Sequence, residues 1–273
     1  MTTIDTAESG LESKHRALWA LGDYATVAAE LVAPLGPVLV RESGIGTRQR
    51  VLDVAAGSGN VAIAAALTGA KVVASDLVPE LLERGAALAR SRGLDLQWRE
   101  ANAEALPFDD ASFDAVLSAI GVMFAPHHQQ AADEMLRVCR PGGTIGVLSW
   151  TPDGFIGQMF ATMKPYVPAP PPGVQPPPLW GDAEHVRGLL GERVAGVVTQ
   201  RRTLRVDHFT DGAAFRDYFK TFYGPTISAY RGIAGDGDGV AALDAELAEL
   251  GDRYLAGSSV MEWEYLIVTA RRR

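Results

Sequence analysis

Between residues 50 and 149, short apolar runs alternate with stretches of helical character, and this alternation constrains the fold more than any other feature. The apolar runs, expected to be strands, are residues 50–54, 71–75, 95–99, 113–118 and 144–149. Helices are expected between them at residues 61–67, 79–92 and 129–138. Such an alternation predicts an α/β fold: a parallel sheet with right-handed crossovers, covered by helices on both faces.

A Gly-rich turn connects the first expected strand to the first expected helix. Gly57 and Gly59 let the backbone approach a ligand without a Cβ atom in the way. The helix that follows presents free N–H groups and the positive end of its dipole. Asp76 ends the next strand, where a carboxylate can accept hydrogen bonds from both hydroxyls of a ribose. Together these residues indicate a site for an adenosine-containing cofactor at the C-terminal edge of the sheet.

Two kinds of cofactor fit this turn. Residues 57–62 match the loose G-x-G-x-x-A form of the dinucleotide fingerprint, which is typical of NAD(P)-binding proteins. Asp53, however, precedes the first glycine by four residues, and its carboxylate would be repelled by a pyrophosphate and attracted by a cationic amino-acid ligand. The turn therefore favours a cofactor with a cationic amino-acid part.

Further short patterns follow in order, so that about residues 48–150 are covered. They are D-x-A-x-G-x-G at residues 53–59, the acidic Asp76, A-N-A-E-A-L-P-F at 101–108, F-D-A-V at 113–116 and R-P-G-G at 140–143. The series resembles the class I S-adenosylmethionine-dependent methyltransferases, with Ala55 in place of the first glycine of their D/E-x-G-x-G-x-G motif. The segment at 101–108 is similar to the D-A-E-x-L-P-F of the branch (type 11) that methylates quinones and other small molecules. The resemblance implies a doubly wound, mostly parallel seven-stranded sheet of Rossmann-like type and S-adenosylmethionine as cofactor.

The resemblance also implies which residues hold the methionine part of the cofactor. The turn is expected to lie beneath it, with contacts from Asp53, Ala55, Gly57 and Gly59. The N-terminal helix that contains Trp19 and Tyr24 is expected to fold over it.

The adenosine part is assigned in the same way. Asp76 is expected to bind the ribose, and Leu77 to lie against the adenine. Asn102 and Ala103 are expected to meet the adenine edge; Asn102 replaces the family's usual Asp, and its amide oxygen can still accept a hydrogen bond. Ser118, after the fourth strand, is expected to border the sulfonium.

A catalytic base is needed only when the acceptor keeps its proton at neutral pH, because placement of the acceptor supplies much of the rate. The candidate bases are histidines. His127 and His128 follow the loop after the fourth strand, and His15 precedes the N-terminal helix. The spacing of the five histidines predicts no metal site.

The rest of the chain is expected to build the acceptor side. The expected parts are an N-terminal helical segment (1–45), the cofactor-binding core (46–150), a Pro-rich cap or lid (151–181) and the C-terminal part of the sheet (182–273) with an inserted helical cap at about 211–256. Residues 1–15 are expected to dock loosely, and a helix at 14–40 to break near Pro34 and Pro37. Aromatic side chains from Phe155 to Tyr230 predict an apolar or aromatic acceptor, although they fit the core of the cap equally well.

Composition narrows the range of partners. The 273 residues carry a net charge of −8, which disfavours nucleic acid because phosphates are held by clustered Lys and Arg. No apolar run approaches the roughly 20 residues of a membrane span. The single cysteine, Cys139, permits no intrachain disulfide and favours a cytoplasmic protein. The composition does not decide whether the chain forms a homodimer.

These features predict an enzyme that methylates an O, N or C atom of a small hydrophobic or aromatic metabolite, mainly through proximity and orientation. Two alternatives stay open: an NAD(P)-dependent oxidoreductase of Rossmann fold, and a protein that binds S-adenosylmethionine without catalysis.

Overall fold

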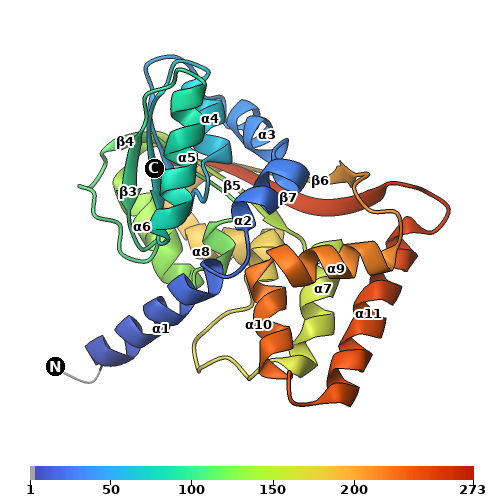
Figure 1. Cartoon of the computed structure of the whole chain (residues 1–273). Helices are drawn as coiled ribbons and strands as arrows, with labels where there is room; N and C mark the ends of the chain where they lie inside the picture. The colour runs from blue at the N-terminus through green and yellow to red at the C-terminus, as the bar shows by residue number, and fades with distance from the viewer. Residues whose placement is uncertain (1–3) are drawn as a thin grey trace.

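The computed structural model describes residues 4–273, which form one seven-stranded sheet flanked by helices (Figure 1). The strands are β1 (Arg50–Val54), β2 (Lys71–Asp76), β3 (Gln97–Glu100), β4 (Phe113–Ala119), β5 (Cys139–Trp150), β6 (Val194–Val206) and β7 (Met261–Arg272). Their order is β3-β2-β1-β4-β5-β7-β6, and β1 to β5 pair in parallel. β7 runs antiparallel to both of its neighbours. The expected doubly wound, mostly parallel sheet is confirmed.

Right-handed crossovers decide which helices cover which face of the sheet. The chain moves from β1 toward one edge and from β4 toward the other, so right-handed connections place α4 (Asn60–Ala66) and α6 (His128–Val138) on opposite faces. α5 (Pro79–Ser91) connects β2 to β3, and α3 (Leu35–Glu42) packs on α4. α8 (Ala183–Leu190) packs on α6. Residues at the C-terminal ends of β1, β2 and β4 line a cavity and can therefore face a ligand.

The N-terminal segment forms more helices than the sequence predicts. The single broken helix at residues 14–40 is wrong: the chain forms α1 (Ile4–Trp19), α2 (Tyr24–Val27), the π-helical turn η1 (Ala28–Val32) and α3. Residues 4–15, expected to dock loosely, belong to α1, and residues 1–3 lie outside the described part. Pro37 lies within the first turn of α3, where a missing N–H breaks no helical hydrogen bond.

Two further irregularities lie in the second half of the chain. The helical region at residues 212–232 is divided into α9 (Gly212–Phe222) and α10 (Gly224–Gly232). They separate at Tyr223, whose backbone is extended (φ −103°, ψ 113°) and bridges to Gly22 of the N-terminal segment. β5 begins at Cys139, earlier than the expected strand at 144–149, so the R-P-G-G motif lies inside the strand, where the register with β4 shifts.

A helical cap lies beyond the ends of β5 and β7, at the lower right of Figure 1. It contains α7 (Phe155–Met163), α9, α10 and α11 (Gly237–Leu255), and α11 packs against both α7 and α9. The Pro-rich segment runs between the short turns η3 (Lys164–Tyr166) and η4 (Pro177–Gly181) without regular structure, as its composition predicts. Two further turns are η2 (Val122–Phe124) and η5 (Gly191–Arg193).

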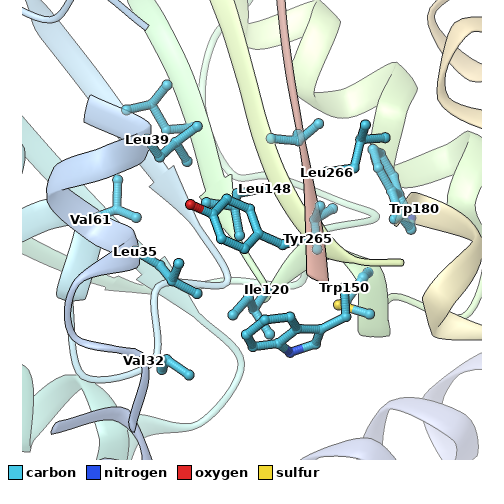
Figure 2. Close-up of a cluster of buried hydrophobic side chains, with 14 of the residues drawn as sticks. Val32, Leu35, Leu39, Val61, Ile120, Leu148, Trp150, Trp180, Tyr265 and Leu266 are labelled. Carbon is cyan, nitrogen blue, oxygen red and sulfur yellow. The ribbon is translucent and has the colours of Figure 1, made fainter. Parts of the chain in front are cut away.

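The hydrophobic core extends from the sheet to the N-terminal helices (Figure 2). Val32 and Leu35, from η1 and α3, lie across from Ile120 and Trp150, which follow β4 and end β5. All four side chains are buried. The N-terminal helices are therefore anchored over the C-terminal ends of the central strands by burial of apolar surface.

No single helix within residues 4–273 is both long and apolar enough to cross a membrane; the stretches Tyr24–Val32 and Leu35–Glu42 meet that test only together, bent by 67°. Over the same residues, no three or more His, Cys, Asp or Glu side chains are arranged to hold a metal ion.

Candidate active site

A cavity of about 360 Å³ opens at the C-terminal ends of β1, β2 and β4, beneath α1, α2 and α3. Its volume lies within the roughly 300–1,000 Å³ range of small-molecule sites. Of the residues expected to form the site, those that line it are His15, Trp19, Tyr24, Asp53, Ala55, Gly57, Asp76, Leu77, Asn102, Ala103 and His127. The topology thus gathers segments that are up to about a hundred residues apart at one edge of the sheet.

Asp53 is a buried carboxyl group at the floor of this cavity, with only 1% of its surface exposed. Its Oδ2 accepts a hydrogen bond from the Ala62 N–H of α4 (2.8 Å), and no Lys or Arg among the described residues pairs with it. Burial raises the pKa of Asp53 to about 8, and the nearby Asp76 charge adds to this effect. A buried acid beside a cavity fits a ligand that brings a positive charge, such as the ammonium group of a methionine derivative.

Asp76 ends β2 and contacts the Gly-rich turn. Its Oδ2 accepts from the Gly57 N–H (2.8 Å) and its Oδ1 from the Val78 N–H (2.9 Å). Burial raises the pKa of Asp76 despite these hydrogen bonds. Each carboxylate oxygen keeps a second lone pair, so the group can still accept hydrogen bonds from two ribose hydroxyls.

The Gly-rich turn carries backbone strain next to the cavity. Ala55 adopts a left-handed conformation (φ +52°), which costs a residue with a Cβ roughly 1–2 kcal/mol relative to glycine. Ile120, in the loop after β4, is also left-handed (φ +62°). Gly121 next to it packs on the turn so closely that a Cβ there would lie 2.1 Å from the Ala55 carbonyl oxygen. Strained backbone of this kind concentrates at ligand sites.

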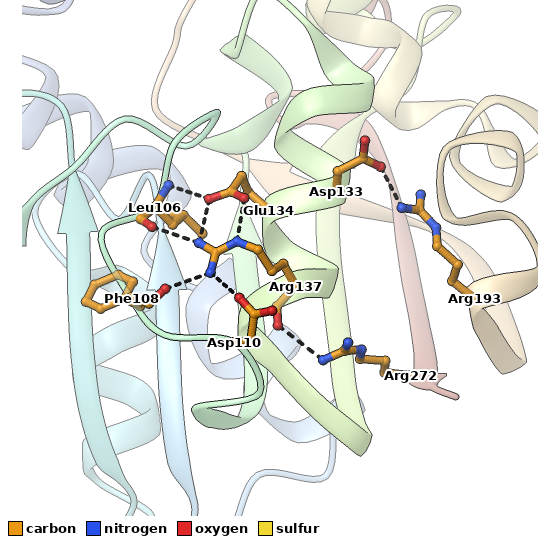
Figure 3. Close-up of polar contacts among 8 residues, drawn as sticks. All are labelled: Leu106, Phe108, Asp110, Asp133, Glu134, Arg137, Arg193 and Arg272. Atoms are coloured by element: carbon orange, nitrogen blue, oxygen red, sulfur yellow. Dashed lines mark hydrogen bonds and ion pairs between the residues drawn. The ribbon is translucent and has the colours of Figure 1, made fainter.

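The segment expected to meet the adenine is held in place on both sides. Asn102 donates from Nδ2 to Glu12 of α1 (3.0 Å), and its Oδ1 accepts from the Glu104 N–H (2.9 Å). Arg137 of α6 fixes the residues that follow, donating to the carbonyl oxygens of Leu106 (2.9 Å) and Phe108 (2.8 Å) and pairing with Asp110 and Glu134 (Figure 3). This side of the cavity is therefore pre-formed by contacts between remote segments.

Aromatic rings from two segments form part of the cavity wall. Trp19 and Tyr24 come from the N-terminal segment, and Phe124 comes from η2. The Trp19 ring contacts Phe124 and Tyr24 edge to face, with centroids 4.5 and 5.3 Å apart. The sequence predicts Trp19 and Tyr24 as part of the site. Phe124 belongs to no sequence motif, and only its position in the loop after β4 could have pointed to it.

Three expected site residues do not line the cavity. Gly59 faces Trp98, whose ring would lie 2.5 Å from a Cβ at this position. Ser118 is fully buried; its hydroxyl donates to the Val54 carbonyl (2.7 Å) and accepts from the Val122 N–H (2.9 Å). Gly59 and Ser118 thus support the shape of the turn and the loop rather than contact the cavity.

The third is His128, which is fully buried although its neighbour His127 faces the cavity. Its Nδ1 lies 3.0 Å from Nε2 of His185 on α8, and its ring packs against Trp180. Burial lowers the pKa of His128 to about 4. His128 therefore packs α6 against α8 and has no access to an acceptor.

The aromatic side chains of the cap are not in the cavity wall either. Phe155, Trp180, Phe215 and Phe219 are almost fully buried among protein atoms. No residue from 151 to 258 lines the cavity, so the expectation that the Pro-rich lid and the cap form its wall is wrong for this conformation. The spacing of the aromatic residues along the sequence did not show that their rings pack against one another.

Comparisons with known proteins point to methyltransferases. A family model described as a methyltransferase domain matches residues 52–147. An uncharacterized protein of Mycobacterium tuberculosis is 56% identical over 274 residues, covering 99% of this chain and all of that protein. The demethylmenaquinone methyltransferase of Thermus thermophilus is 40% identical over 106 residues, which are 38% of this chain and 48% of that protein.

A solved structure shares the fold. The crystal structure of a putative methyltransferase from Bacillus halodurans superimposes with a TM-score of 0.59 at 19% identity, covering 86% of this chain and 97% of that one. The family match favours methyl transfer over the dehydrogenase alternative. Residues 52–147 carry a methyltransferase domain, and the chain has the fold of the class I S-adenosylmethionine-dependent methyltransferases.

Proposed function

We propose that this methyltransferase acts on a small, largely apolar acceptor that binds in the same cavity as S-adenosylmethionine. The observation that carries the proposal is the composition of the cavity wall. The wall contains two buried carboxyl groups, Asp53 and Asp76, as well as apolar side chains that include Val32, Leu35 and Ile120. A wall with both buried acids and apolar surface suits a charged cofactor beside an apolar acceptor.

The cofactor supplies an activated methyl group on a sulfonium. In the proposal, Asp53 attracts its ammonium group, and Ala55 with Gly57 lies beneath its methionine chain. Asp76 holds the ribose. These roles follow from burial, charge and backbone approach at each position.

The adenine is assigned to Leu77, Asn102 and Ala103. Trp19 and Tyr24, which reach the cavity from the N-terminal segment, cover the methionine end and exclude water from the reacting atoms. Because methyl transfer from a sulfonium depends chiefly on alignment, this enclosure supports catalysis by placement.

Calorimetric titration with S-adenosylhomocysteine tests the cofactor assignment. Asp76→Ala should weaken the affinity at least tenfold, a loss of about 1.4 kcal/mol. Asp114→Ala is the matched control, because Asp114 lies at the other end of β4 and pairs with Arg140 (2.6 Å), away from the cavity. Equal affinity of the wild type and Asp76→Ala would show that the ribose lies elsewhere.

A further inference from the structure

Three ionisable side chains from separate segments meet at one side of the cavity. His15 comes from α1, Glu104 from the loop after β3, and His127 from the residue before α6. His15 interacts electrostatically with both of the others. The N-terminal helix, the adenine segment and the loop after β4 thus each bring one such group to the same place.

Glu104 holds His127 through both of its carboxylate oxygens. Oε1 accepts a hydrogen bond from the His127 backbone N–H (2.5 Å), and Oε2 lies 3.1 Å from the ring Nδ1. The two side chains are 12% and 28% exposed, so the pair is largely enclosed but still accessible. Because an ionised carboxylate can only accept, the proton of a neutral His127 ring belongs on Nδ1 and the lone pair on Nε2.

The Nε2 edge of His127 is open. No described residue makes a hydrogen bond to it. Gly173 of the Pro-rich segment lies near this edge: a Cβ there would be 4.0 Å from Nε2, and glycine leaves that space free. Gln175, two residues on, fixes the segment by donating its N–H to the Pro126 carbonyl (3.0 Å).

His15 and Glu104 are two titratable groups close to His127, and residues 167–178 of the Pro-rich segment contain no titratable side chain. Burial lowers the pKa of His15, so its ring stays neutral near neutral pH and adds no positive charge that would oppose protonation of His127. The site is therefore arranged to accept a proton at Nε2 and to stabilise the resulting imidazolium with the Glu104 carboxylate.

We infer that His127 is a general base positioned by Glu104, and that the acceptor carries an acidic hydroxyl, either phenolic or enolic. The inference rests on the proposed function. The acceptor hydroxyl gives its proton to Nε2 as its oxygen bonds to the methyl carbon. The carbon–sulfur bond breaks, and its electron pair stays on sulfur, leaving a neutral thioether. Carbon or amine nucleophiles without such a proton would not need the pair.

The competing explanation is that Glu104 only anchors the N-terminus of α6, where a carboxylate is favoured by the helix dipole. Glu104→Gln separates the two explanations. The amide oxygen can still accept from the His127 N–H, but its NH₂ group must donate to Nδ1. That substitution keeps the anchor and moves the ring proton to Nε2, which can then no longer act as a base.

The first experiment is ¹⁵N NMR of histidine-labelled full-length protein, without cofactor or acceptor. His127 should show the Nδ1–H tautomer in the wild type and the Nε2–H tautomer in Glu104→Gln. An Nε2–H tautomer in the wild type, or an unchanged tautomer in the variant, overturns the inference. This readout is independent of cofactor binding, so it stays distinct from a failure of the proposed function.

The second experiment measures methyl transfer to substituted phenols, each paired with its aniline. Phenols should be methylated in preference, and His127→Gln and Glu104→Gln should each lower kcat about a hundredfold with KM for S-adenosylmethionine within threefold. His208→Gln, a surface histidine outside the cavity, is the control and should keep wild-type kcat. A preference for anilines, or a kcat within twofold of wild type in both variants, contradicts the assignment.

Discussion

The C-terminal ends of β1 and β2 and the helical cap beyond β5 and β7 are both well buried, yet they bury opposite kinds of side chain. At the strand ends the buried groups are the carboxyls of Asp53 and Asp76. In the cap they are aromatic rings: Phe155 lies 4.8 Å from Phe215 and 5.2 Å from Trp263, centroid to centroid. The carboxyl groups at the strand ends line a cavity, whereas the aromatic rings of the cap pack against other rings of the protein.

The difference shows which kind of burial points to a ligand. Aromatic rings that contact one another satisfy the need to remove apolar surface from water, so nothing further has to bind them. A buried carboxyl group without a cationic partner is costly unless a ligand or proton neutralises it. The acidic strand ends are therefore the stronger evidence for function, although the aromatic cap is the more conspicuous feature of the sequence.

The largest expected effect lies in the cap. Phe155→Ala should lower the free energy of unfolding by about 3–5 kcal/mol, because it removes a fully buried ring and leaves a cavity. Urea denaturation measures the loss, and S-adenosylhomocysteine affinity should stay within twofold in the folded protein. A large loss of affinity with little loss of stability would place Phe155 in the ligand site and break the comparison.

A smaller effect is expected at the roof of the cavity. Trp19→Ala should change the free energy of unfolding by no more than about 1 kcal/mol, because Trp19 is only partly buried. Its affinity for S-adenosylhomocysteine should fall about tenfold in calorimetric titration, as the contact over the ligand is lost. Tyr166→Ala, at the end of η3 and away from the cavity, should leave the affinity unchanged. Equal affinities for the two variants would argue that α1 does not cover the ligand.

A third effect is a pH dependence of stability at the strand ends. Burial raises the pKa of Asp53 from its ordinary 3.8 to about 8, so the folded protein binds this proton more tightly than the unfolded chain. The stabilisation is fully present below about pH 4 and is lost as the pH rises toward about 8. Asp53→Asn should flatten this decline in urea denaturation of the cofactor-free protein across that range. Parallel curves for the two proteins would mean that Asp53 is not the group responsible.

The sequence predicted the central sheet because its signals are local. The first strand has the expected bounds, 50–54, and the acidic residues at 53 and 76 reach the cavity as expected. Helix division in the N-terminal segment was not predicted, because the break at residues 20–23 depends on contacts with the cap, including a hydrogen bond from the Asp23 N–H to the Phe222 carbonyl (3.0 Å). Contacts between residues so far apart in the sequence do not change the local hydrophobic periodicity from which helices are predicted.

The two adjacent histidines show where the sequence alone reaches its limit. It places His127 and His128 together at the start of a helix after the fourth strand. In the tertiary structure, His127 contacts Glu104 beside the cavity, whereas His128 contacts His185 in the core. The strands of the core, the Gly-rich turn and the acidic strand ends follow from the sequence itself, because periodicity and turn chemistry act between near neighbours. Which side chain meets a ligand was decided by packing, because the partners that orient it come from distant segments.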